Sequence, residues 1–281
     1  MVQREKLPVA LTVAGSDSGG GAGIQADLKT FAALGVHGTS AIACLTAQNP
    51  KRVLEIETCS PRMLRRQIEA VFEELPPRAV KTGMLFSAEN ISVVVNFFRN
   101  SKFEIRNLKL VVDPVLVSTS GAKLLEPAAI KILREKLLPL ATLVTPNLSE
   151  AEILAGRKIS NAEEMRAAAK QIHSQFGCAV LVKGGHLRGV SEAVDIFFDG
   201  KTELLLSAPF VKGFRTHGTG CTYSAAICAA LALGHDLPGA VEIAKKFVTA
   251  AISHSYRIGK HFVLDQTGIT QARRWREYSG R

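Results

Sequence analysis

Residues 215–224, with the sequence RTHGTGCTYS, place two glycines directly before a run of small and apolar residues that continues to residue 233. Glycine permits positive φ, and Ala, Ile, Leu and Cys then recur at helical spacing, so the segment predicts a glycine turn that leads into a buried helix. The N–H groups of such a turn and the positive end of the helix dipole attract phosphate, or charge developing on a phosphoryl group. We therefore expect an anion-binding turn here.

Cys221 directly follows the second glycine of this turn, at the expected start of the helix. The field at a helix N-terminus favours the thiolate, so the thiol is a candidate base. The alternative is that Cys221 is simply a small residue where a bulky one would clash. Because perturbed thiols concentrate at sites of this kind, we favour the functional interpretation.

Four polar residues lie at the predicted carboxyl ends of strands. Asp113 ends the apolar run KLVVDP, and Lys183 ends AVLVK. Asn147 and Glu150 follow the strand expected at 142–146. Ligands of open α/β sheets bind at this edge, where a carboxylate commonly handles magnesium and a lysine beside glycines can meet a phosphate. Each residue alone is more typical of a polar surface, but their common position favours a site.

The glycine-rich segment at 15–27 follows the first predicted strand. It lacks the GK[ST] ending of a Walker loop, and its glycines do not have GxGxxG spacing. Its backbone can still approach a ligand closely. Asp27, in the first turns of the next helix, either faces that ligand or stabilises the helix N-terminus, and both interpretations stay open.

Two other strand ends carry groups suited to an aromatic ring. Gln48 ends the strand expected at 37–48, and its amide can pair with a heterocycle that presents both a donor and an acceptor. Met84 ends the strand expected at 79–84 and can form an apolar wall against a ring. The alternatives are an amide that caps a loop and a methionine that fills the core.

The pattern of strands and helices that would position these residues predicts an α/β fold with a largely parallel, doubly wound sheet. Strands are expected at 8–15, 37–48, 79–84, 109–114, 142–146 and 179–185, with a hairpin at 193–206 around Asp199-Gly200. One helix is expected to end at Leu34, and a second to span 61–75 after the N-cap candidate Ser60. Three more are expected: one that begins at 147, one that follows the anion-binding turn, and one at about 237–256. Residues 115–125 form a polar loop that contains Gly121.

The composition and charge favour one domain with a solvated basic surface. The chain of 281 residues is 47% hydrophobic and has no linker, repeat or low-complexity run, so we expect one domain over 1–281. Its net charge is +10, but Lys and Arg are scattered, apart from a cluster at Arg273, Arg274 and Arg276. Attraction of anionic substrates explains this charge better than nucleic-acid binding, because one Trp and three Tyr offer few stacking platforms.

The expected location is the cytoplasm. The five cysteines form no CxxC pair and look like reduced intracellular thiols. The charged N-terminus leads straight into a strand without a signal peptide, and the most apolar later stretch is too short to span a bilayer. We therefore expect no membrane partner.

Seven segments occur in the order typical of one known family: GSDSGGGAGIQADLKTF at 15–31, LTAQN at 45–49, KTGML at 81–85, VVDPV at 111–115, TPNLSEAE at 145–152, KGGH at 183–186 and GTGC at 218–221. Together they resemble hydroxymethylpyrimidine and hydroxymethylpyrimidine-phosphate kinases, the thiamine-pathway members of the ribokinase-like superfamily. The resemblance implies a three-layer α/β/α sandwich with a mostly parallel central sheet, ATP as phosphoryl donor, Mg²⁺ as cofactor and a homodimer. It also implies two successive phosphorylations of 4-amino-5-hydroxymethyl-2-methylpyrimidine, first to the monophosphate and then to the diphosphate.

The same resemblance implies roles for the matching positions. Substrate-binding residues are expected at Gly15, Asp27, Gln48, Met84 and Val115. Magnesium is expected at Asp113 and Glu150, and the phosphates at Asn147, Lys183 and Thr216. Catalytic roles are expected for Lys183, for Gly218, Thr219 and Gly220 of the anion hole, and for Cys221 as the base.

Cys221 stands where many superfamily relatives carry Asp, which favours pyrimidine kinases over sugar kinases. A pyridoxal kinase with the same scaffold and the same Cys is the nearest alternative. A non-catalytic pyrimidine sensor and a nucleic-acid binder are the alternatives from other classes, and the intact set of Asp113, Glu150, Lys183 and Cys221 argues against a sensor. The tail after Lys260 matches no segment of the family.

Overall fold

The computed structural model describes residues 6–105, 107–116, 125, 127–185, 187, 191–211 and 216–268, of which Thr216 is described for its backbone alone. Most of the polar loop predicted at 115–125, including Gly121, lies outside the described residues. The basic cluster at Arg273, Arg274 and Arg276 lies outside them as well.

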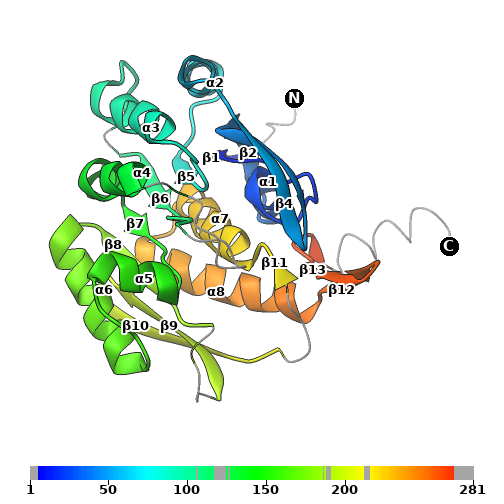
Figure 1. The fold of residues 1–281 in the computed structure, drawn as a ribbon, viewed down its shortest axis with the longest axis vertical. Helices are drawn as coiled ribbons and strands as arrows, with labels where there is room; N and C mark the ends of the chain where they lie inside the picture. Colours follow the sequence, from blue (N-terminus) through cyan, green and yellow to red (C-terminus); the bar gives the residue numbers. More distant parts are fainter. Residues whose placement is uncertain are drawn as a thin grey trace.

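An eight-stranded sheet forms the centre of the molecule (Figure 1). Six strands pair in parallel: β1 (Val9–Ala14), β2 (His37–Ile42), β5 (Ala79–Thr82), β6 (Lys109–Val112), β7 (Leu143–Val144) and β8 (Ala179–Lys183). The hairpin of β9 (Glu192–Phe198) and β10 (Glu203–Pro209) pairs antiparallel to β8 at one edge. The order is β10-β9-β8-β7-β6-β5-β1-β2, so the mostly parallel sheet and the hairpin around Asp199-Gly200 are confirmed.

Helices cover both faces of this sheet because successive residues of a strand point to opposite sides. In β6, Leu110 and Val112 pack into one core and Val111 into the other. One core holds residues of α2 (Pro61–Glu74), α3 (Ala88–Asn100), α4 (Pro127–Ile132), the helical turns Leu133–Leu137 and Leu138–Leu140, α5 (Leu148–Ala155) and α6 (Ala162–Phe176). The other holds residues of α1 (Gly23–Ala33), α7 (Thr219–Ala232) and α8 (Leu237–Ser253). The three-layer α/β/α sandwich is therefore confirmed.

Local sequence signals explain where several helices begin and end. The Ser60 side chain caps α2 by accepting a hydrogen bond from the N–H of Met63, and Pro61 occupies the first helical position, as predicted. Gly156 and Gly177 end α5 and α6 in the left-handed conformation that glycine adopts without a Cβ penalty. The C-terminal end predicted for α8 is wrong by about three residues, because this helix ends at Ser253 and β12 begins at Tyr256.

The single strand predicted at 37–48 is wrong. The chain leaves the main sheet after Ile42, and β3 (Cys44–Asn49) pairs antiparallel with β4 (Arg52–Thr58) in a separate two-stranded sheet. Burial alternates along β3, with Cys44 buried and Leu45 exposed, whereas a central strand would be buried on both faces. Almost all of β4 is exposed, so no apolar run marked it in the sequence.

A small third sheet joins the C-terminal part of the described chain to the glycine turn before α7. β13 (His261–Val263) pairs in parallel with β11 (Thr216–His217) and antiparallel with β12 (Tyr256–Ile258). The segment after Lys260 therefore supports the residues that immediately precede Gly218. Across the described ranges, every helix is too short or too polar to cross a lipid bilayer.

Candidate functional site

The carboxyl ends of the parallel strands meet the N-terminus of α7, where the predicted glycine turn is confirmed. Gly218 is the N-cap of α7 and has φ +87°. A Cβ on Gly218 would collide with the backbone oxygen of Gly21, so the turn packs directly against the glycine-rich segment after β1. Only glycine permits both the conformation and this close approach. In an α-helix the first N–H groups lie beyond the reach of acceptors one turn back, and helices that bind anions do so through such groups.

Asp113 and Lys183 lie against the first turn of α7. Lys183 Nζ is 3.1 Å from Asp113 Oδ1, and the Ser224 hydroxyl donates to Asp113 Oδ2 at 3.1 Å. A Cβ on Gly220 would lie 3.3 Å from Lys183 Nζ, which places this cation at the glycine turn. Burial raises the pKa of the Asp113 carboxyl, but the charges of Lys183 and Lys81 outweigh this and lower it. Asp113 is therefore a buried carboxylate.

Glu150 and Asn147 form a capping box at the start of α5. Glu150 Oε2 accepts from the N–H of Asn147 at 2.9 Å, and Asn147 Oδ1 accepts from the N–H of Glu150 at 3.0 Å. The other Glu150 oxygen accepts from the N–H of Leu116 at 3.1 Å. Burial, together with the negative charge of Asp113, raises the pKa of Glu150 to about 7, although Lys183 acts in the opposite direction.

Cys221 is the third residue of α7 and is partly exposed. The expectation that the helix field favours its thiolate is wrong. Desolvation is the largest effect and raises the pKa of the Cys221 thiol to about 11, even though the nearby Lys81 ammonium lowers it. Removal of water from around the sulfur, together with the negative charges of Asp27 and Asp113, outweighs the attraction of Lys81, so the thiol is neutral near pH 7.

Asp27 forms a buried ion pair that sequence reasoning missed. Lys81 Nζ lies 2.7 Å from both carboxylate oxygens of Asp27, and the Thr12 hydroxyl donates to Oδ2 at 2.6 Å. Because α1 begins at Gly23, Asp27 is not in its first turn, and the interpretation as a helix N-terminal charge is wrong. One signal was available, since Lys81 interrupts a short strand whose other three residues are apolar or small.

Three of the residues expected around an aromatic ring lie at neighbouring strand ends. The N–H of Gly15 donates to the carbonyl oxygen of Met84 at 2.9 Å, so these two positions are in direct contact. Val115 follows β6 and has φ +45°, an uncommon backbone conformation for a β-branched residue. Such strain is found at sites where the surroundings fix the backbone.

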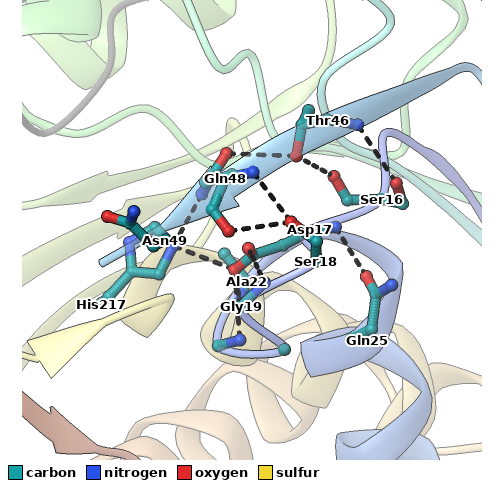
Figure 2. A network of polar contacts seen from close by, with 12 residues as sticks. Ser16, Asp17, Ser18, Gly19, Ala22, Gln25, Thr46, Gln48, Asn49 and His217 are labelled. Atoms are coloured by element: carbon teal, nitrogen blue, oxygen red, sulfur yellow. Dashed lines mark hydrogen bonds and ion pairs between the residues drawn. The ribbon is translucent and has the colours of Figure 1, made fainter. Parts of the chain in front are cut away.

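Gln48 contacts a network of polar side chains that also includes two unpredicted residues, Asp17 and His217 (Figure 2). Gln48 Nε2 lies 2.9 Å from His217 Nε2, which in turn lies 3.1 Å from Asp17 Oδ2. Asp17 also accepts from the N–H groups of Gly19, Gly21 and Ala22. The network joins the β3–β4 hairpin, the glycine-rich segment and the residue before Gly218.

Among the described residues, no three His, Cys, Asp or Glu side chains are grouped to hold a metal ion by themselves. Asp113 and Glu150 provide two carboxylates, which matches the usual mode of Mg²⁺ binding through one or two carboxylates plus water and substrate phosphates. A surface cavity of about 520 Å³ near α2 and α3, lined by Arg65, Asn96 and Lys102 among others, shares no residue with this site.

The known proteins to which this chain is similar are small-molecule kinases. The family model described as phosphomethylpyrimidine kinase matches residues 17–264. A hydroxymethylpyrimidine/phosphomethylpyrimidine kinase of Rhizobium meliloti is 50% identical over 251 residues, which cover 89% of this chain and 92% of that protein. A solved structure of a phosphomethylpyrimidine kinase of Clostridium difficile is 43% identical to this chain and superposes with a TM-score of 0.76. The match covers 88% of this chain and all of that one. An ADP complex of Bacillus subtilis pyridoxal kinase is 34% identical to this chain and superposes with a TM-score of 0.85. The match covers 95% of this chain and all of that one.

Proposed function

Because the chain belongs to the phosphomethylpyrimidine kinase family, we infer that it phosphorylates 4-amino-5-hydroxymethyl-2-methylpyrimidine and then the resulting monophosphate, as a kinase of thiamine biosynthesis. ATP is the proposed phosphoryl donor. The observation that carries this proposal is the position of the Asp113–Lys183 pair against the glycine turn of α7. A cation and a row of backbone N–H groups at one point suit the charge that develops on a transferred phosphoryl group.

We propose that Gly218, Thr219 and Gly220 form the anion hole and that Lys183 holds the phosphoryl group. Asn147 and Thr216 are proposed to lie near the nucleotide phosphates; the Asn147 side chain also caps α5, and the Thr216 side chain lies outside the described residues. Asp113 and Glu150 are proposed as the magnesium ligands, and Mg²⁺ would offset charge on the phosphates. Lys183 already contacts Asp113, so its ammonium group would lie beside the proposed metal ligands.

Cys221 is proposed as the group that accepts the proton of the substrate hydroxyl. Only the thiolate form of Cys221 can accept this proton, and the raised pKa of the thiol keeps that form a small fraction at neutral pH. A loose phosphoryl-transfer transition state, however, requires little activation of the nucleophile. The second phosphorylation needs no such proton transfer, because its acceptor is an ionised phosphate oxygen. The base is therefore proposed to act mainly in the first step.

We propose that Gln48 pairs with the aminopyrimidine edge and that Gly15, Met84 and Val115 surround the ring. Asp27 is proposed to contribute to the same pocket, although its own side chain has no exposed surface and is paired with Lys81. We further propose one domain over 1–281, a homodimer and a cytoplasmic location. The five free cysteines support the location, and the exposed Leu45 and Leu54 of the β3–β4 hairpin support the dimer.

A pyridoxal kinase is the second candidate, favoured by the structural similarity to the pyridoxal kinase of Bacillus subtilis. The test compares ATP-dependent ADP formation with hydroxymethylpyrimidine, its monophosphate and pyridoxal, with products identified by mass spectrometry and Lys183→Met as the control. We expect stoichiometric ADP with both pyrimidines and a lower kcat/KM with pyridoxal. A higher kcat/KM with pyridoxal would reverse the assignment, and no ADP with any acceptor would support a binding protein instead.

A further inference from the structure

His217 links two parts of the site that are far apart in the sequence. Its ring nitrogen Nε2 lies between the Gln48 amide and the Asp17 carboxylate, 2.9 Å from Gln48 Nε2 and 3.1 Å from Asp17 Oδ2 (Figure 2). The Asp17 side chain is 2% exposed, and the N–H groups of Gly21 and Ala22 also donate to its Oδ2. Asp17 is therefore held rigidly by its own loop and provides a fixed anchor for the imidazole.

The two contacts of His217 Nε2 are incompatible with each other as the Gln48 amide stands. A ring nitrogen carries either one hydrogen or one lone pair in the ring plane. Burial raises the pKa of Asp17, but hydrogen bonds from His217 and from the N–H groups of Gly19 and Ala22 lower it below its usual value. Asp17 is thus an ionised carboxylate that only accepts, whereas the NH₂ group of Gln48 only donates.

A second conflict appears at the other end of the same amide. The Thr46 hydroxyl has one hydrogen, which it donates to the carbonyl oxygen of Ser16 at 2.8 Å. Its contact with Gln48 Oε1, at 3.5 Å, would require the same hydrogen again. Rotation of the Gln48 amide by 180° removes both conflicts, because each contact then joins a donor to an acceptor, and hydrogen-bond networks of this kind assign amide orientation. The single His217 Nε2–H is then shared between Gln48 Oε1 and Asp17 Oδ2, and the Gln48 NH₂ group faces Thr46 Oγ1 as a donor.

We propose that His217 is a positioning residue which, anchored by Asp17, holds the Gln48 amide with its oxygen toward His217 and its nitrogen toward Thr46. This orientation leaves one lone pair on the oxygen and one N–H on the nitrogen for a ligand. The pocket therefore selects a ring edge that presents a donor beside an acceptor, with the donor on the His217 side. Identification of that edge as the amino group and ring nitrogen of an aminopyrimidine rests on the proposed function.

The first test reads the protonation of His217 directly and does not depend on any substrate. Long-range proton–nitrogen correlation spectra of the histidine-labelled, ligand-free protein distinguish the two tautomers, and the His217 signals are assigned by their absence in His217→Gln. We expect a hydrogen on Nε2, in the neutral or the charged ring. An Nε2 without hydrogen would show that it accepts from Gln48, and the proposal would be overturned.

The second test asks whether His217 acts through the aminopyrimidine edge. Dissociation constants are measured by calorimetry for hydroxymethylpyrimidine and for the same molecule without its 4-amino group, in the wild type, His217→Leu and His217→Gln. His217→Leu removes the donor, whereas His217→Gln can place an NH₂ group near the position of Nε2. We expect His217→Leu to lower the preference for the amino compound about tenfold, within the range for a lost hydrogen bond, and His217→Gln to restore most of it.

An equal loss of affinity for both compounds in His217→Leu, or no restoration by His217→Gln, would assign His217 a purely structural role. If the wild type bound neither compound, the proposed function would be wrong. The tautomer measurement would still decide the orientation of Gln48 in that case. The two failures are therefore distinguishable.

Discussion

Lys81 Nζ lies 2.7 Å from both carboxylate oxygens of Asp27, and neither side chain has any solvent-exposed surface. Replacement of one partner leaves the other as a buried charge without compensation, which typically costs about 3–5 kcal/mol. We expect Lys81→Met to lower the free energy of unfolding by that amount, measured by urea denaturation. The double variant Lys81→Met with Asp27→Leu should recover a large part of the loss, because no unpaired charge remains.

Lys158→Met is the matched control for this prediction. Lys158 also pairs with a carboxylate, that of Glu152 at 3.1 Å, but its side chain is 91% exposed. We expect a change within about 0.5 kcal/mol, as is usual for surface substitutions. Equal effects of the two lysine variants would mean that the Lys81–Asp27 pair is not the buried anchor that the structure indicates.

Glu150 should make the stability of the metal-free protein fall as the pH rises. Its pKa is about 7 in the folded protein, against the ordinary value of 4.5, because burial and Asp113 disfavour the charged form. The folded state therefore binds more protons than the unfolded state between these pH values. As the pH rises through this range, the free energy of unfolding falls by at most about 1.4 kcal/mol per pH unit. Glu150→Gln, which retains an acceptor for the capping box, should remove this decline. Identical pH profiles of unfolding for both proteins would contradict the assignment.

The parts of the fold that the sequence predicted are those decided by local pattern. β6 is a short strand that ends at Val112, directly before Asp113, and its apolar run predicted both the strand and the position of its carboxyl end. The exposed β4 has no apolar run, so only pairing with β3 defines it. Asp17 and His217 are 200 residues apart, and no periodicity connects positions at that separation. The direction of the Cys221 pKa shift was also beyond sequence reasoning, because desolvation depends on everything packed around the sulfur.

Gln48→Leu should weaken binding of the pyrimidine substrates by about 1–3 kcal/mol, because polar ring atoms would lose their partners in the pocket. The expected result is a higher KM for hydroxymethylpyrimidine, with the KM for ATP nearly unchanged. Ala47→Gln, at an exposed position next to Gln48 on β3, is the control and should change neither constant. Normal kinetics with hydroxymethylpyrimidine in Gln48→Leu would show that the pyrimidine binds elsewhere.

The Cys221 thiol should resist alkylation at neutral pH. Its pKa is raised to about 11, chiefly by burial, and only the thiolate reacts readily with iodoacetamide. We expect labelling of the ligand-free protein at Cys221, followed by peptide mass spectrometry, to be slow at neutral pH and to rise roughly tenfold per pH unit towards the pKa as the thiolate fraction grows. A plateau of fast labelling already at pH 8 would mean that the helix field outweighs desolvation after all.

Cys221→Ala should separate the two phosphorylations. Loss of a general base typically lowers a rate roughly 10²–10⁴-fold, and the hydroxyl of the first substrate is the only acceptor that must lose a proton. We expect a loss in that range for the first step, a smaller loss for the second, and retained fold and ATP binding. Cys221→Asp should keep partial activity, because a carboxylate can accept the same proton. Both steps are measured at saturating ATP and magnesium. Equal losses in the two steps would mean that Cys221 shapes the glycine turn or the position of the substrate. Unchanged rates in both steps would mean that Cys221 has no part in the mechanism.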